Sequence, residues 1–179
     1  MTKGATSRTI PAMVETDFLQ ILLSHDRWAT AQLLGACGKL TGDQFHRRFE
    51  IGPGSLHDTF THIVGSMRAW TETLARQEHR PRLEAHGQRR TPEQLLSLLE
   101  GTWREFAAEA RRLPLEETVT RRTRDGKTFQ ITRGAVVAQV TTHGMHHRAQ
   151  CLSMLRQLGV KPLPPSSVAE WTRTGDAQV

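Results

Sequence analysis

Apolar residues recur at steps of three and four positions along much of this chain, with polar residues between them. That period is typical of an amphipathic helix that turns one face toward a core. The first such stretch starts near Val14 and stops at Gly38, and its apolar positions are Phe18, Leu22, Leu23, Trp28, Leu33 and Leu34. A helix that ends at the glycine is predicted there.

A second helix is predicted after a loop from Asp43 to Gly54. Ser55 and Asp58 stand three residues apart, which is the spacing of a capping box at the start of a helix. One apolar stripe then follows at helical spacing and consists of Leu56, Phe60, Ile63, Met67, Trp70 and Leu74.

A third helix is predicted after the polar and basic segment from Gln77 to Arg90, which is expected to be a loop. Thr91 is a good N-cap, and Pro92 suits the first helical position because its missing N–H is not needed there. The helix is expected to run to about Leu113.

The period then changes from helical to alternating. β-prone residues between Thr118 and Ile131 flank Asp125 and Gly126, a strong signal for the turn of a hairpin. A fourth helix is predicted from about Arg133 to Leu158, and Gly159 ends it.

Four amphipathic helices in one chain of 179 residues most economically form a single bundle. The predicted fold class is therefore all-α: a four-helix bundle with a small β-hairpin excursion before the last helix. Residues 1–12 are expected to be a flexible N-terminal tail, residues 13–165 the bundle, and residues 166–179 a C-terminal tail.

Composition excludes several other classes of protein. Hydrophobic residues make up 37% and charged residues 23% of the chain, which is ordinary for a globular domain. No apolar run approaches the roughly 20 residues that cross a bilayer, and the first dozen residues lack the apolar block of a secretory signal. A cytoplasmic protein without membrane contact is expected. Cys37 and Cys151 lie far apart on apolar segments, which favours reduced core thiols over a disulfide.

The net charge of +6 raises the question of nucleic acid as a partner. The basic residues are spread along the chain in pairs instead of one tract, and no nucleic-acid-reading motif is present, so nucleic acid is not expected. An intermediate interpretation is that the positive charges create a field that attracts an anionic small molecule to a pocket.

The most specific chemical feature is a pair of histidines, His143 and His147, four residues apart in the last predicted helix. Residues at this spacing share one helical face, so two imidazoles can hold one metal ion. They continue the apolar stripe of that helix, and the small Gly144 between them is expected to leave room for the ion. His146 lies about 100° around the helix from His147.

His62, well inside the second predicted helix, is the candidate for a third ligand. His57 lies in the first turn of that helix, where capping or surface exposure is the expected role. Three neutral imidazoles would leave a position open for water or substrate, which is the arrangement of a catalytic site. Sequence motifs of zinc proteases, serine hydrolases and nucleotide-binding loops are absent.

Three blocks of the chain resemble the DinB family of metal-binding four-helix proteins, which are distinct from the DNA polymerase of that name. Residues 25–29 are similar to the family's YNRWAN, residues 54–63 to its GSLxxTLxHI, and residues 142–150 to its NHxxHHRGQ. The resemblance covers about residues 14–160. The chain departs from the family pattern at His25 and Asp26, at Thr142, and at Ala149.

The resemblance implies a metal triad of His62, His143 and His147, which are the same three residues chosen above. It also implies a divalent metal ion, zinc or nickel first and iron or manganese as alternatives, and a homodimer. Several family members resemble thiol transferases, so the expected partners are a low-molecular-weight thiol and a small electrophilic substrate.

Three functions remain open on the sequence: a metal-dependent thiol S-transferase, a metal-dependent hydrolase, and a non-catalytic metal-binding or sensing module. The transferase is the leading hypothesis. Asp58 and His57 are candidates for orienting a ligand, although helix capping at the surface is favoured. Arg148 is a candidate for binding a substrate carboxylate, with a surface salt bridge as the alternative. His146 stands three residues from His143 and is the alternative second metal ligand, but the four-residue spacing of His147 brings the rings into closer register and is preferred. The sequence assigns no role to His25.

Overall fold

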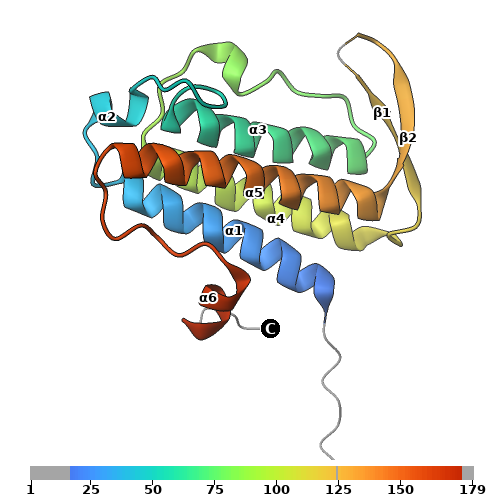
Figure 1. Ribbon diagram of the computed structural model, residues 1–179. Coiled ribbons are helices and arrows are strands. Elements are labelled where there is room, and N and C mark those ends of the chain that lie inside the picture. The colour runs from blue at the N-terminus through green and yellow to red at the C-terminus, as the bar shows by residue number, and fades with distance from the viewer. Residues whose placement is uncertain (1–16, 124, 175–179) are drawn as a thin grey trace, which may run out of the picture.

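Four long helices form the body of the protein in the computed structural model, which describes residues 17–123 and 125–174. They are α1 (Phe18–Cys37), α3 (Leu56–Leu74), α4 (Pro92–Arg112) and α5 (Arg133–Gln157) (Figure 1). These are the four predicted helices, with ends that differ from the predicted ones by a few residues at most. The expected tail of residues 1–12 lies outside the described residues.

The helices begin where the sequence supplies a capping side chain. Asp17, Ser55, Thr91 and Thr132 each accept a hydrogen bond from the backbone N–H three residues on. Such caps satisfy one of the N–H groups that have no partner inside a helix. At α3 the predicted capping box is only half formed, because the Asp58 carboxylate contacts Arg48 and His57 and does not accept the backbone N–H of Ser55.

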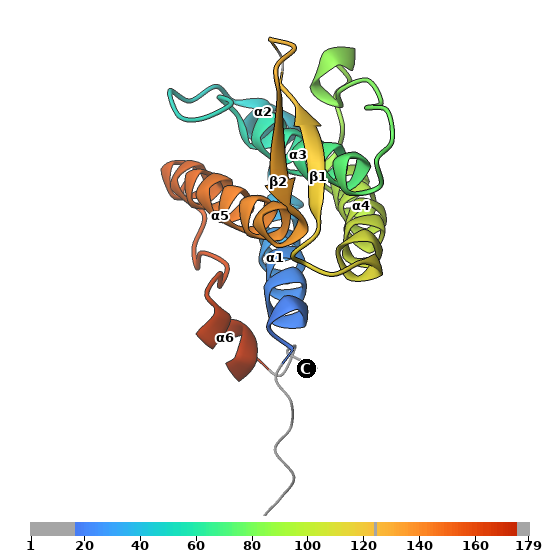
Figure 2. The same ribbon diagram turned by 90° about the vertical axis from the view of Figure 1, so that its right-hand side faces the viewer.

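Each long helix packs mainly against two others. The helices α3 and α1 both contact α4 and α5, which places α3 diagonally across from α1 (Figure 2). The connection after α3 carries the chain back along that helix through the short 3₁₀ helix η1 (Glu84–His86), so α4 runs in the same direction as α3 (Figure 1). The helix α5 runs antiparallel to α3 beside it, which brings the middle of α5 against the first half of α3.

Three short elements lie in segments that were expected to be loops or tails. The helix α2 (Gly42–His46) follows a capping box between Thr41 and Gln44, and α6 (Val168–Arg173) follows one between Ser167 and Glu170. The 3₁₀ helix η1 is the third. Segments this short contain too few positions to show a helical period. The helix α6 packs its Trp171, 2% exposed, with Trp28 and Ala29 of α1.

The predicted hairpin is present between α4 and α5. Strands β1 (Thr118–Arg122) and β2 (Thr128–Thr132) pair antiparallel, with Val119 opposite Ile131. Val119 is 2% exposed and packs into the core. Arg121 lies over the ring of Trp70, 4.4 Å from its centroid, and so fixes the hairpin to α3. The four-helix bundle with a hairpin before its last helix is confirmed.

The core follows most of the predicted stripes, but Phe18 and Leu22 of the first stripe are 75% and 45% exposed. On α3, every position of the stripe except Trp70 is at most 2% exposed. Cys37 and Cys151 are free and buried, and burial raises the pKa of the Cys37 thiol to about 12. In the part of the chain that the structure describes, no helix is long and apolar enough to span a membrane.

Candidate metal centre

His62 of α3 meets His143 and His147 of α5 at the contact between the two helices. The Nε2 atom of His143 lies 3.1 Å from the Nε2 atoms of both other rings. The three residues form a group in which one nitrogen from each lies within 4.8 Å of the others. The antiparallel packing of α3 and α5 is what brings together histidines 81 residues apart.

The opposite nitrogen of two of these rings is held by a second residue. His62 Nδ1 donates to Glu84 Oε1 at 3.0 Å, and His147 Nδ1 donates to Gln150 Oε1 at 2.8 Å. An imidazole whose Nδ1–H is bound in this way presents the lone pair of Nε2. The rings are thus fixed in the tautomer that a metal ligand needs.

Proton counting shows that this cluster suits a cation. Because His62 and His147 use their N–H groups on Glu84 and Gln150, both offer only an acceptor at Nε2. His143 can donate one proton toward one of them, which leaves another lone pair facing the cluster without a donor. One ion bound at about 2.0–2.1 Å from each nitrogen would satisfy all three.

Burial favours the neutral form of His143 and His147. It lowers the pKa of His143 to about 4, and the neighbouring His147, His62 and His146 act in the same direction. Burial also lowers the pKa of His147, against the opposing hydrogen bond to Gln150. The neutral form is the one that binds metal, so the lowered pKa values of His143 and His147 are compatible with an ion at neutral pH.

Two glycines make room for the residues that orient the rings. A Cβ atom at Gly65 would stand 3.1 Å from Glu84 Oε2, and one at Gly52 would stand 2.1 Å from Gln150 Oε1. Gly52 also has φ +52, a conformation that side chains disfavour. Glu84 lies in a predicted loop without any signal, whereas Gln150 stands three residues after His147 and belongs to the last motif.

The sequence suggested that Gly144 makes room for a metal ion, but the structure shows that it does not. A Cβ atom there would stand 2.5 Å from Asp26 Oδ1 and 2.8 Å from Arg148 Nη1. The space beside the glycine is filled by an ion pair between Asp26 and Arg148, which are 2% and 4% exposed. Thr30 accepts a further bond from Arg148 at 3.2 Å. Burial raises the pKa of Asp26, and the charge of Arg148 opposes that shift.

Arg148 is therefore neither a substrate-binding group nor part of a surface salt bridge, the two roles considered for it. The sequence pattern could not reveal this pairing, because Asp26 lies 122 residues away and only the contact between α1 and α5 joins them.

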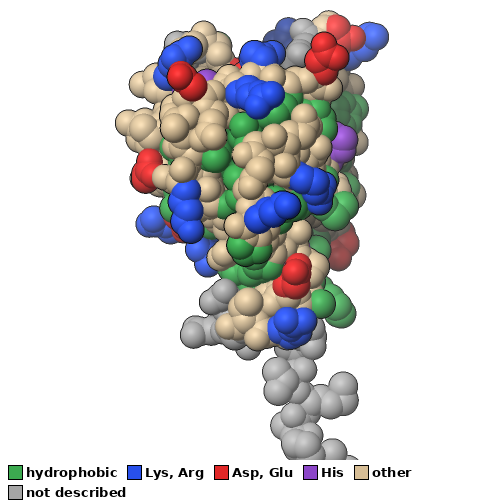
Figure 3. All heavy atoms as spheres, turned by 60° about the vertical axis from the view of Figure 1, so that its left-hand side comes forward, with side chains coloured by type: hydrophobic (Ala, Val, Ile, Leu, Met, Phe, Trp, Pro, Cys, Tyr) green, Lys and Arg blue, Asp and Glu red, His purple; other side chains and the backbone are tan. Residues whose placement is uncertain are grey.

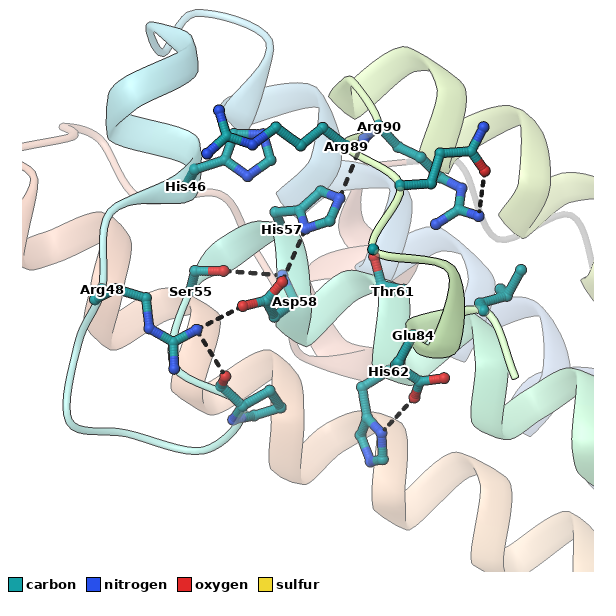
Figure 4. Close-up of a pocket in the computed structure, with 14 residues that line it drawn as sticks. His46, Arg48, Ser55, His57, Asp58, Thr61, His62, Glu84, Arg89 and Arg90 are labelled. Atoms are coloured by element: carbon teal, nitrogen blue, oxygen red, sulfur yellow. Dashed lines mark hydrogen bonds and ion pairs between the residues drawn. The ribbon is translucent and has the colours of Figure 1, made fainter. Parts of the chain in front are cut away.

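His57 was expected to cap the helix or lie at the surface, but it is only 7% exposed. Its Nε2 accepts the backbone N–H of Arg90 at 3.1 Å, and its Nδ1 donates to Asp58 Oδ1 at 2.9 Å (Figure 4). Burial alone would raise the pKa of Asp58, but bonds from His57 and Ser55 and the charge of Arg48 lower it below its ordinary value. His57 and Asp58 build one wall of a pocket beside His62.

His146, beside the cluster, and His25, on α1, have other partners. His146 Nε2 is bonded to the amide of Gln150 at 3.0 Å, and its ring lies 5.0 Å from that of His147. His25 Nε2 donates to the carbonyl oxygen of Ser166 at 3.0 Å and its ring packs near Trp171, so His25 fixes the C-terminal segment to α1.

Fold and site together define a class: a four-helix bundle with a three-histidine cluster that is compatible with metal binding, built between two facing helices. The profile of the DinB family matches residues 13–174, and the chain belongs to this family. A comparison with curated proteins gave no match.

Among solved structures, the chain is similar to the crystal structure of a DinB-like protein, YjoA, from Bacillus subtilis. The TM-score is 0.58 at 18% sequence identity, and the match covers 83% of this chain and 96% of the other. At this identity the likeness shows the fold.

Proposed function

We propose that His62, His143 and His147 hold a divalent metal ion, zinc or nickel first, and that the protein is a metal-dependent transferase of a low-molecular-weight thiol. The metal site rests on the meeting of three ring nitrogens: Nε2 of His143 lies 3.1 Å from Nε2 of His62 and from Nε2 of His147. The Nδ1 atoms of His62 and His147 are bound by Glu84 and Gln150. Iron and manganese are the alternative ions.

The set of three histidine ligands favours a site in which the metal also binds a molecule from outside the protein. Among the described residues, no aspartate, glutamate or cysteine joins the three histidines in the group. Three protein ligands leave at least one position for an outside molecule, as in catalytic sites, whereas structural sites are closed by four. A non-catalytic sensing module would be expected to close the site.

A divalent ion held by His62, His143 and His147 would lower the pKa of a thiol bound to it and so make the thiolate available near neutral pH. Residues of the chain orient the ligands and attract the thiol. Glu84 and Gln150 keep the ligand nitrogens aimed at one point. The net charge of +6 favours the approach of an anionic thiol. The thiol gives its proton to solvent, and its sulfur then forms a bond to the electrophilic atom of the substrate. The bond from that atom to a leaving group breaks at the same time, and the leaving group departs with the electron pair and takes up a proton from solvent.

A metal-dependent hydrolase is the second candidate, because Glu84 is a carboxylate beside the cluster. Its carboxylate oxygen binds Nδ1 of His62, however, which is on the opposite side of the ring from Nε2. In that position it orients the ligand and does not face the open side of the site, where a base for hydrolysis is needed.

The metal site is tested by elemental analysis of protein purified without affinity metals. His62→Ala, His143→Ala and His147→Ala should each lose stoichiometric metal, because two ligands remain on a site built for three. His146→Ala, on the same helix, is the matched control and should keep most of its metal, as should His57→Ala. Full occupancy in His147→Ala would contradict the assignment.

The transferase is tested by calorimetry of thiols in buffers of different ionisation enthalpy. Binding to the zinc-loaded protein should release protons near neutral pH, since a free thiol has a pKa of roughly 8.5. The affinity should fall as salt rises. Equal binding by metal-free protein, or binding without proton release, would refute the transferase and leave the hydrolase and the sensing module.

A further inference from the structure

A pocket of about 490 Å³ opens beside His62 at the start of α3 (Figure 4). Its walls come from three segments that are distant in the sequence: the chain around α2, the first turns of α3, and residues 83–90 before α4. The volume lies within the range of small-molecule sites, which is roughly 300–1,000 Å³. His62 lines this pocket and also belongs to the histidine cluster, so the two features share one side chain.

Two buried polar groups in the wall of this pocket have no hydrogen-bond partner among the described residues. They are Nη1 of Arg90 and Oγ1 of Thr61. Arg90 is 8% exposed and Thr61 is 2% exposed. A buried polar group without a partner costs about 1–3 kcal/mol, and more when it is charged. Both residues line the pocket, so a ligand bound there can supply the missing partner.

Arg90 is held in position from two sides. Its backbone N–H donates to His57 Nε2 at 3.1 Å, and its Nη2 donates to Gln88 Oε1 at 2.9 Å. The next residue, Thr91, begins the capping box of α4 and so ties this stretch of chain to a long helix. The guanidinium is therefore preorganised, with Nη1 left over as a donor.

The charges around the pocket leave two cations uncompensated. Arg48 pairs with Asp58 at 2.7 Å, and Glu84 is bound to His62. Arg89 and Arg90 have no carboxylate within ion-pair distance in the part of the chain that the structure describes. An anionic group entering the pocket would thus meet two free positive charges in a partly desolvated space, where electrostatic attraction is strong.

We propose that this pocket binds a carboxylate group of the substrate, with the guanidinium of Arg90 and the hydroxyl of Thr61 as its donors and with Arg89 adding charge. A planar guanidinium matches the two oxygens of a carboxylate better than any other side chain does. The proposal rests on the proposed function, because it takes the histidine cluster as the reacting end of the same site. Either the thiol or the electrophile carries the carboxylate.

The first experiment measures binding of 3-mercaptopropionate and of its amide to the zinc-loaded full chain by calorimetry. The acid should bind about tenfold more tightly than the amide or better, since a bond to a charged group contributes more than a neutral one. This preference should disappear in Arg90→Gln and shrink in Thr61→Val, which removes only the hydroxyl. Arg104→Gln, an exposed arginine on α4 outside the pocket, is the matched control and should keep it.

The second experiment uses a ligand without a thiol, so that the pocket is tested apart from the metal chemistry. Glutarate titrated into metal-free protein should shift the side-chain NMR signals of Arg90 and Thr61 but not those of Arg104. This experiment uses the unsubstituted protein, so its result does not depend on whether a variant folds.

The two experiments separate the two proposals. Glutarate binding at Arg90 without any thiol binding would refute the transferase and support the pocket. Glutarate binding together with equal affinities for acid and amide would assign the carboxylate to the electrophile. Thiol binding with proton release, but with no preference for the acid and no glutarate shift, would overturn the carboxylate pocket and leave the transferase standing.

Discussion

At the scale of single residues, the candidate site depends on groups that contact the histidines as much as on the histidines themselves. Glu84 and Gln150 select the tautomer of two rings and hold their orientation. Ligand histidines in proteins commonly have such partners, and losing one weakens metal binding.

Removal of either orienting residue should weaken metal binding without abolishing it. Glu84→Ala and Gln150→Leu are each expected to lower zinc affinity about 10–100-fold, measured by competition with a chromogenic chelator. Glu100→Ala, which removes an ion pair with Arg27 on the α1 and α4 side, is the control and should leave the affinity unchanged. Unchanged affinity in both orienting variants would mean that the Nδ1 bonds do not support the site.

The two helical glycines Gly144 and Gly101 should respond to alanine in opposite ways. Gly144→Ala places a methyl group against the buried pair of Asp26 and Arg148 and is expected to lower the free energy of unfolding by about 2–4 kcal/mol. Gly101→Ala has no atom within 4 Å of the new methyl group and should raise it by about 0.5–1 kcal/mol through helix propensity.

Urea denaturation of the two metal-free variants, each compared with the unsubstituted protein, measures this difference. An unchanged free energy of unfolding in Gly144→Ala would show that the ion pair of Asp26 and Arg148 moves aside without cost.

At the scale of elements, α6 is attached to the bundle by a small contact that includes a titratable group. His25 of α1 donates to the Ser166 carbonyl and packs with Trp28 and Trp171. Burial lowers the pKa of His25 below 6.5; the bond to Ser166 and Asp26 oppose this shift, and Arg148 supports it. The attached form therefore prefers a neutral His25.

This preference predicts that α6 detaches as the pH falls. Below about pH 6.5 the detached state takes up a proton on His25 that the attached state does not, so attachment weakens by at most about 1.4 kcal/mol per pH unit. Trp171 fluorescence, taken as the difference from Trp171→Phe, should shift to longer wavelength on acidification. His25→Phe should remove that shift between pH 6.5 and 5, and a shift that persists in this variant would assign the effect to another group.

At the scale of the whole molecule, the charge is dispersed. On the face that Figure 3 shows, Lys and Arg side chains are scattered singly and in small groups among uncharged and acidic ones. The two uncompensated arginines of the pocket matter because of where the fold places them, not because the chain carries +6 overall.

The expectation of a homodimer remains a proposal, and α1 offers a surface for it. Phe18 and Leu22, one turn apart, are 75% and 45% exposed. Exposed apolar pairs of this kind favour association with another surface. Sedimentation at micromolar concentration should give twice the 20.2 kDa of one chain. Phe18→Ser with Leu22→Ser should shift the protein toward the monomer, whereas Phe129→Ser on the hairpin should not; a monomer in the unsubstituted protein would refute the dimer.

The sequence by itself determined the long elements and the identity of the three histidines. Periodic apolar positions, N-cap side chains and the Asp125-Gly126 turn act within a few residues of one another, so they can be recognised without a structure. The spacing of His143 and His147 is likewise a local property of one helix.

Only the tertiary structure decided what surrounds those histidines. Glu84, the Asp26 and Arg148 pair beneath Gly144, and the unpartnered Arg90 and Thr61 are all set by contacts between segments far apart in the sequence. No periodic pattern encodes such contacts, because they depend on the order in which the helices pack and on the path of the loop that returns along α3. The role of each polar residue therefore follows from what the fold places beside it.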